Sequence, residues 1–176
     1  EPFIWIIEPC FKRQGGSPNV ESETYLYYIK LQPSLPSQGI FRFWNEAAEQ
    51  IALNDFKTLM LNTSFLEDMR IEVTDYTFPN GVVGKIITYD MEERERVRIV
   101  DYQGEEVDRA KIDEQLRERG IELRLDSFLD NNTVARIKTV VKEIMAEKGF
   151  TNAEVTHTVT PVAGGPKLVN VTFNVD

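Results

Sequence analysis

Residues 64–93 read SFLEDMRIEVTDYTFPNGVVGKIITYDMEE, and residues 149–176 read GFTNAEVTHTVTPVAGGPKLVNVTFNVD. Each stretch contains a phenylalanine, a segment in which apolar and polar residues alternate, a glycine-containing turn and a second alternating segment. Such alternation is typical of half-buried strands, and two of them around a glycine turn indicate a β-hairpin. An amphipathic helix precedes each hairpin. The repeat of this unit after roughly 85 residues predicts a tandem pair of small α+β modules.

Both long helices have a recognisable beginning and an apolar face. Asn45 is the expected N-cap of the first helix, and Asp130 or Asn131 that of the second. Apolar residues then recur at helical spacing on one face of each helix: Ala48, Ala52, Phe56, Leu59 and Met60 in the first, and Val134, Ile137, Val141, Ile144 and Met145 in the second. Each helix is therefore expected to pack one face on a sheet.

The second module is the more regular in sequence. RVRIVDYQG (96–104) predicts a strand with Val97 and Ile99 on one face, and residues 107–116 predict a short helix. The order is β-α-α-β-β. In the first module TYLYYIKL (24–31) predicts the opening strand, because it is aromatic and β-branched. SLPSQGIFRFW (34–44) then occupies the place of the short helix, which we expect to be shortened or irregular.

These patterns predict an α+β fold of two tandem modules, each a three-stranded mixed sheet with helices on one face. We expect an unassigned N-terminal arm at residues 1–23, a first module at 24–94 and a second at 95–176. The joint MEERERVRI (91–99) is so short that the modules should keep a preferred relative orientation. Its charge run, residues 92–96, is expected to be solvated or to form ion pairs between the modules.

The composition excludes several classes of protein. The chain of 176 residues has a formal net charge of -9, and both modules are acidic, which argues against nucleic acid as a partner. No apolar run is long enough to cross a bilayer, and FIWII (3–7) lacks the flanks of a signal peptide. The single cysteine, Cys10, forbids an internal disulfide framework and leaves the redox compartment undecided.

The sequence contains no recognisable catalytic motif. One histidine and one cysteine, far apart in sequence, make no metal-ligand cluster. His157 lies in register with Val155 and Val159, so we expect a structural histidine on the core side of its strand. Gly164-Gly165 follows a strand without opening a helix, which makes it a turn and not a phosphate-binding loop. We expect no catalytic residue, no metal and no cofactor.

The order of elements and several motifs resemble the polypeptide-transport-associated (POTRA) domain. The motifs are a phenylalanine between the long helix and the hairpin (LNTSFLEDMRIEV, 61–73; EKGFTNAEV, 147–155), the hairpin itself, and a closing strand that ends acidic. RVRIVDYQGEEVDRAKI (96–112) resembles the beginning of such a domain. Residues 74–104 and 164–176 are similar to the BamA family of outer-membrane assembly factors, of acidobacterial type. The resemblance covers about residues 24–176.

The resemblance implies a periplasmic scaffold that receives unfolded outer-membrane proteins, docks accessory lipoproteins and precedes a C-terminal membrane β-barrel. It also implies that the exposed edge is the first strand of each hairpin, which can accept an extended segment by β-augmentation. In this sequence the expected peptide-binding residues are Met69, Arg70, Ile71, Glu72 and Val73 in the first module and Val155, Thr156, His157, Thr158, Val159 and Thr160 in the second.

Three other readings stay open at this stage. POTRA-like modules of other transport barrels or of cell-division proteins bind one partner, and the sequence that follows Asp176 would separate these from an assembly factor. The β-α-α-β-β order also resembles KH-type RNA-binding domains, although the acidic charge and the missing GxxG loop argue against them. A small enzyme is the third alternative, although no catalytic motif supports it.

Overall fold

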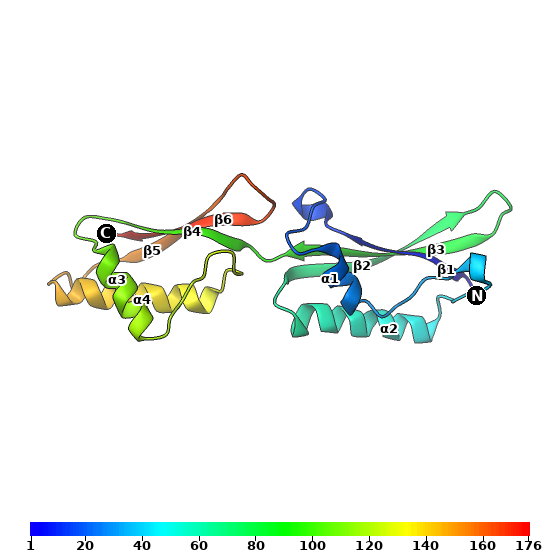
Figure 1. Ribbon diagram of the computed structural model, residues 1–176, viewed down its shortest axis with the longest axis horizontal. Helices are drawn as coiled ribbons and strands as arrows, with labels where there is room; N and C mark the ends of the chain where they lie inside the picture. The colour runs from blue at the N-terminus through cyan, green and yellow to red at the C-terminus, as the bar shows by residue number, and fades with distance from the viewer. The chain divides into compact units, whose positions relative to one another are not determined.

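The computed structural model describes all residues, 1–176, and divides into two compact units, Glu1–Arg94 and Glu95–Asp176. In each unit the α-helices lie on one face of a small sheet, and the other face carries no α-helix (Figure 1). Both sheets have three strands, and their central strand pairs in parallel with the first strand and antiparallel with the other. The predicted fold class, two α+β modules with mixed sheets, is confirmed.

Unit 2 has the order predicted from its sequence. Its elements are β4 (Arg96–Gln103), α3 (Arg109–Glu118), α4 (Asn131–Glu147), β5 (Val155–Pro161) and β6 (Leu168–Val175), and its strand order is β4-β6-β5. The carboxylates of Asp108 and Asp130 accept hydrogen bonds from the main-chain N–H groups of Lys111 and Asn132. These N-caps satisfy helix donors that would otherwise lack a partner, so they fix where α3 and α4 begin.

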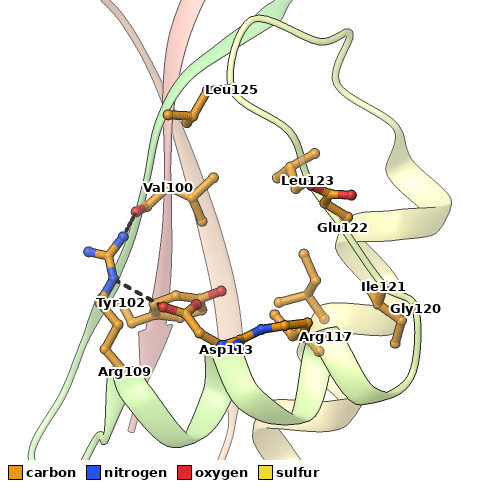
Figure 2. Close-up of a pocket in the computed structure, with 12 residues that line it drawn as sticks. Val100, Tyr102, Arg109, Asp113, Arg117, Gly120, Ile121, Glu122, Leu123 and Leu125 are labelled. Atoms are coloured by element: carbon orange, nitrogen blue, oxygen red, sulfur yellow. Dashed lines mark hydrogen bonds and ion pairs between the residues drawn. The ribbon is translucent and has the colours of Figure 1, made fainter.

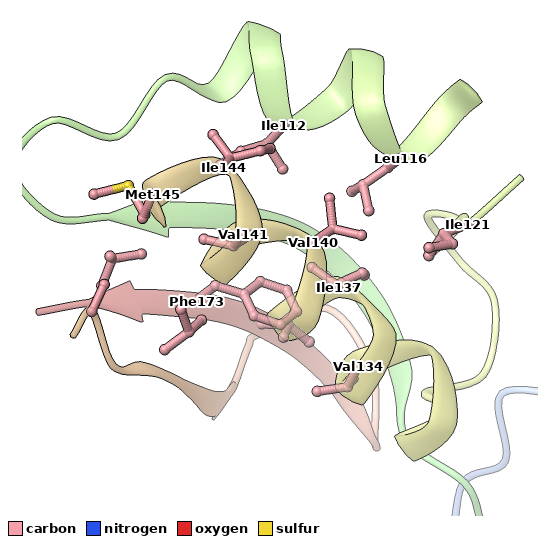
Figure 3. Close-up of a cluster of buried hydrophobic side chains, with 14 of the residues drawn as sticks. Ile112, Leu116, Ile121, Val134, Ile137, Val140, Val141, Ile144, Met145 and Phe173 are labelled. Atoms are coloured by element: carbon pink, nitrogen blue, oxygen red, sulfur yellow. The ribbon is translucent and has the colours of Figure 1, made fainter. Parts of the chain in front are cut away.

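The core of unit 2 lies between its helices and its sheet (Figure 3). Phe173 of β6 is fully buried beneath α4. Val171 of the same strand and Val97 of β4 are fully buried in the same core. The apolar face of α4 supplies most of the remainder, and all five residues predicted for that face are buried. The long helix therefore packs on the sheet as its periodicity indicates.

Unit 1 repeats this architecture with a different beginning. Its elements are β1 (Phe3–Cys10), the 3₁₀ turn η1 (Lys12–Gln14), α1 (Ser22–Tyr28), the 3₁₀ turn η2 (Pro36–Gln38), α2 (Glu46–Lys57), the π-helical turn η3 (Thr58–Asn62), β2 (Leu66–Thr77) and β3 (Val83–Glu93). The strand order is β1-β3-β2. Asn45 caps α2, as expected, and Ile87, Tyr89 and Met91 of β3 are fully buried.

The predicted opening strand at residues 24–31 is wrong, because Ser22–Tyr28 forms the helix α1. Tyr25 and Ile29 are buried one helical turn apart, whereas Tyr27 between them is 71% exposed. This spacing is helical, and it prevails over the β-propensity of aromatic residues because tertiary packing decides such cases. The short helix of unit 1 is therefore α1, and residues 34–44 contribute only η2 and extended chain.

The residues expected to form an unassigned arm, 1–23, are an integral part of unit 1. Phe3–Cys10 is its first strand and pairs in parallel with β3. Glu93, expected to lie in a solvated charge run, is fully buried, and its carboxylate accepts hydrogen bonds from the side chains of Gln14 and Tyr25 and the main-chain N–H groups of Asn19 and Val20. The arm thus surrounds the end of β3.

Ile99 does not share a face with buried Val97, contrary to the sequence reading, and it is 51% exposed. A β-bulge between Val97 and Ile99 shifts the register, so Val100 and Tyr102 pack against the core instead. Unit 1 has a bulge at the corresponding place, between Ile4 and Ile6. The two units therefore share an irregularity as well as a fold.

Candidate functional site

Both segments expected to bind peptides lie on strands at the edge of a sheet. β2 pairs only with β3, and β5 pairs only with β6. Met69–Val73 and Val155–Thr160 are therefore on edge strands, which present main-chain N–H and C=O groups without a neighbouring strand.

The hydrogen-bond register shows which groups of β5 point outward. Glu154 and Asp176 exchange both main-chain hydrogen bonds, at 3.2 and 3.0 Å. Such pairs alternate along an antiparallel ladder. Thr156, Thr158 and Thr160 therefore direct their main-chain groups towards β6, whereas Val155, His157 and Val159 direct theirs towards the open side. Pro161, which has no N–H, ends the outward series, as expected for proline in an edge strand.

The side chains of β5 separate into a polar and an apolar set. Thr156, Thr158 and Thr160 are exposed on the face without α-helices. Val155 is buried, and His157 and Val159 are partly buried on the helix-covered face. An extended segment added to this edge would pair with outward main-chain groups whose own side chains face the core.

His157 lies on the helix-covered face, as predicted. Its ring centroid is 6.4 Å from that of Phe173, and its Nδ1 atom is buried without a hydrogen-bond partner. Burial lowers the pKa of His157, and the ammonium of Lys138 on α4 lowers it further. The imidazole is therefore neutral at neutral pH, and the β5 edge carries no positive charge of its own.

The β2 edge has the same main-chain pattern with different side chains. Phe78 donates to the carbonyl of Val82 at 2.8 Å, and counting in steps of two along the ladder directs the main-chain groups of Met69, Ile71 and Val73 outward. On the face without α-helices, Lys12 and Arg13 of η1 form ion pairs with Glu72 and Asp68. Glu72 and Asp68 of β2 thus have partners within unit 1.

The opposite edges of both sheets are partly covered. Ile4 of β1 donates to the carbonyl of Arg42 at 2.7 Å and accepts from Ser34 at 2.8 Å. In unit 2, the main-chain N–H of Val97 in β4 donates to the carbonyl of Ser127 at 2.9 Å, and its carbonyl accepts from the main-chain N–H of Asp126 at 2.6 Å. In each unit the chain that leads into the long helix occupies this edge. The open edges are therefore those of β2 and β5.

A cavity of about 480 Å³ lies between β4, α3 and residues 120–125 (Figure 2). Arg109 of α3 donates to the carbonyl of Val100 at 2.9 Å, lies 3.8 Å from the carboxylate of Asp113, and sits over the ring of Tyr102. Burial, with a smaller contribution from the charge of Asp113, raises the pKa of Tyr102 to about 12. Arg109 thus closes a further part of the β4 edge.

This cavity was not found from the sequence. Its walls combine apolar side chains with Arg117 and Glu122, residues that read as ordinary surface positions of a short helix and a loop. Only the contact between α3 and the loop brings them together, and no spacing in the sequence indicates that contact. The mixed walls point to no particular ligand.

Two further structural findings bear on function. No group of three or more His, Cys, Asp or Glu side chains in the chain is arranged to hold a metal ion. None of its helices combines the length and the apolar character needed to span a membrane.

Comparison with known proteins identifies one family. The family model for POTRA, described as "Surface antigen variable number repeat", matches residues 95–176, which is the whole of unit 2. Unit 2 is a POTRA domain, and unit 1 repeats its architecture. A search of the curated proteins found no match.

Solved structures with a similar fold include POTRA domains of outer-membrane proteins. BamA POTRA3-5 of Haemophilus influenzae is 16% identical over 99% of this chain and 66% of that one, with a TM-score of 0.42. The N-terminal domain of Omp85 from Thermosynechococcus elongatus is 18% identical over 99% of this chain and 63% of that one, with a TM-score of 0.41. POTRA1-2 of the periplasmic domain of Omp85 from Anabaena is 16% identical over 98% and 94%, with a TM-score of 0.38. The chain thus spans slightly less than two thirds of the first two, and similarities of this size carry no argument about function.

Proposed function

We propose that this chain, whose second unit is a POTRA domain, is a periplasmic partner-binding region of an outer-membrane β-barrel assembly protein. Its role would be to receive extended segments of unfolded outer-membrane proteins by strand addition and to dock accessory lipoproteins. In the full-length protein a C-terminal membrane β-barrel would follow. The proposal includes no turnover, metal or organic cofactor.

The observation that carries the proposal is the difference between the two edges of each sheet. The β5 edge directs the N–H groups of Val155, His157 and Val159 into the open, whereas the chain before the long helix occupies the β4 edge. Main-chain pairing needs no particular side chains, so one edge can accept many sequences. This property suits a receiver of varied clients.

β5 is the better of the two candidate edges. Its exposed threonines keep this edge soluble without charged side chains and leave it free to pair. In β2, Glu72 and Asp68 are held by ion pairs with residues of η1. We therefore expect the stronger attachment at Val155–Thr160 and a weaker one at Met69–Val73.

The test places a proline at a residue of β5 whose main-chain N–H points away from β6. His157→Pro removes an outward N–H without breaking the ladder to β6, so the fold should persist while the affinity for an alternating apolar peptide falls several-fold. His157→Ala is the matched control, because it removes the side chain and keeps the N–H. Thr158→Pro should instead destabilise unit 2, since that N–H points towards β6. Equal affinity of the His157→Pro and His157→Ala variants would contradict the proposal.

A region that binds a single partner, in another transport barrel or in a cell-division protein, makes a different prediction. A general receiver should bind peptides of shuffled sequence with similar affinity as long as apolar residues alternate. A dedicated partner-binding region should reject all but one of them. Titrating a panel of shuffled alternating peptides against the chain separates these two functions.

A further inference from the structure

Unit 1 carries a group of aromatic side chains at the hairpin end of its sheet, on and beside the face without α-helices. We call this group the aromatic patch; its members are Phe3, Trp5, Phe41, Phe43, Tyr76 and Phe78. The rings of Trp5 and Tyr76 have centroids 4.4 Å apart, Trp5 and Phe78 4.8 Å, and Phe3 and Phe78 5.8 Å. The patch joins three parts of the chain: β1, the segment before α2, and the β2–β3 hairpin.

Gly84 allows these rings to pack closely against β3. A Cβ atom at this position would approach atoms of Phe3 at 3.0 Å, Trp5 at 3.1 Å and Phe78 at 3.2 Å. Such distances are shorter than ordinary van der Waals contacts, so a larger residue would displace the rings. The glycine in β3 thus leaves the space that the rings of the patch occupy.

The patch remains exposed after this packing. Phe41 is 52% exposed, and Phe43 and Tyr76 are also among the exposed large hydrophobic residues. Val82, at 46%, and Val83 extend the apolar surface around the hairpin turn. A contiguous exposed surface of this kind marks an interaction site more often than scattered apolar residues do.

Unit 2 shows that the fold does not require the patch. Ile4 pairs with Lys85, Val97 pairs with Val169, and a bulge follows each, so Phe3 and Trp5 correspond to Arg96 and Arg98. The same register makes Tyr76 and Phe78 correspond to Val162 and Gly164. One architecture therefore exists with arginines where unit 1 has aromatic rings, which indicates a role other than folding.

Charge decides what kind of partner fits. Residues 2–7, 31–41 and 76–84, which supply every member of the patch except Phe43, contain no Asp, Glu, Lys, Arg or His, although 28% of the chain is charged. Arg42, between Phe41 and Phe43, is half-buried and donates to the carbonyl of Pro33. The corresponding end of unit 2 has Arg96, Arg98, Arg124, Asp126 and Lys167. The first 94 residues hold 8 Lys and Arg against 14 Asp and Glu, a net charge of -6. A surface with a single charged side chain, on an acidic unit, suits a partner without net negative charge.

We propose that the aromatic patch binds the interfacial region of a lipid bilayer with zwitterionic headgroups. Tryptophan, tyrosine and phenylalanine concentrate at the boundary between headgroups and acyl chains, where a ring can be partly buried beside polar groups. The loop ends around Phe41 and Val82 contain one charged side chain, Arg42, and an arginine can keep its guanidinium among the headgroups while its apolar stem lies deeper. The acidic remainder of unit 1 is repelled by anionic lipids.

The test measures partitioning of the whole chain onto phosphatidylcholine and phosphatidylethanolamine vesicles by flotation. Phe41→Glu and Val82→Glu each place a charge at an exposed position, so the fold should persist. Together they should lower partitioning at least tenfold. Leu125→Glu is the matched control, because it makes the same change at a 63% exposed loop residue of unit 2, and it should bind like the unaltered chain.

Adding phosphatidylglycerol to the vesicles should weaken binding, and the emission of Trp5 should shift to shorter wavelength on zwitterionic vesicles. No partitioning, binding that requires phosphatidylglycerol, or binding that is equal in the patch variant and the control would each overturn the proposal. The proposal would also be overturned if the unaltered chain did not bind vesicles and the patch variant lost binding to a protein partner. Peptide binding at the β5 edge should be the same in the patch variant, so this test and that of the proposed function fail independently.

Discussion

Glu93 joins residues 14–25 to the end of β3 through its carboxylate. One carboxylate oxygen accepts from Gln14 at 2.8 Å and from the main-chain N–H of Asn19 at 2.6 Å. The other accepts from the N–H of Val20 at 2.9 Å and from the hydroxyl of Tyr25 at 2.6 Å. A fully buried carboxylate is tolerated only with such a set of donors.

Glu93→Gln should lower the free energy of unfolding of unit 1 by about 2–4 kcal/mol. Either orientation of the amide places its NH₂ group against a main-chain N–H, which leaves a buried donor unsatisfied. Urea unfolding of the variant measures the effect. Glu67→Gln, at an exposed position of β2, is the control and should change stability by less than about 0.5 kcal/mol. Similar values for the two variants would show that the Glu93 site is dispensable.

His157 is the only histidine of the chain, so its titration can be followed without assignment of other rings. Its lowered pKa means that the unfolded chain binds the proton more readily than the folded chain. Unit 2 should therefore lose stability as the pH falls through 6.5, the ordinary pKa of histidine, towards the lowered folded value. An NMR titration should give a midpoint below 6.5, and Lys138→Gln should raise it. A midpoint at or above 6.5 would contradict the burial of this ring.

At the scale of elements, the sequence predicts what local patterns determine. The hairpins, the two long helices and their caps Asn45 and Asp130 follow from periodicity and from the residues at helix ends. The edge position of Met69–Val73 and Val155–Thr160 agrees with the resemblance to the POTRA family. Which main-chain groups point outward depends on how each strand is paired with its neighbour. The sequence of a single strand does not specify this register.

The failures in unit 1 have a common cause. Tyr25 is buried through packing with Phe11 and a hydrogen bond to Glu93, partners that lie 14 and 68 residues away. β1 forms because β3, far along the chain, pairs with it in parallel. Local propensity instead favours a strand for the aromatic residues around Tyr25. Long-range contacts therefore place the first strand and the short helix earlier in the chain than local propensity indicates.

This correction predicts the effect of deleting residues 1–23. The deletion removes β1 and most of the donors to Glu93, and it leaves β3 with an unpaired edge. Unit 1 should unfold while unit 2 stays folded. A ¹H–¹⁵N NMR spectrum should then contain dispersed signals that match those of residues 95–176 alone. Dispersed signals from residues 24–94 would show that the segment is an accessory arm after all.

At the scale of the whole molecule, the connection between the units contains no free residue. β3 ends at Glu93 and β4 begins at Arg96. The N–H of Arg94 donates to the carbonyl of Phe65 in unit 1 at 2.8 Å, and the carbonyl of Glu95 accepts from Leu129 in unit 2 at 2.8 Å. Both linking residues are thus bonded to their own unit. The semi-rigid joint expected from the sequence stays a prediction.

Inserting Gly-Ser-Gly-Ser between Arg94 and Glu95 should loosen the pair without unfolding either unit. Gly-Ser segments behave as flexible chains, so the units would sample a wider range of orientations. Small-angle scattering should show a broader distribution of distances for the insertion variant than for the unaltered chain, with equal melting temperatures. The matched control inserts the same residues between Asn80 and Gly81 in the exposed β2–β3 turn. This insertion lies within unit 1 and leaves the connection between the units at its original length. If the unaltered chain already matches the distribution of the joint variant, the hydrogen bonds of Arg94 and Glu95 do not restrain the units.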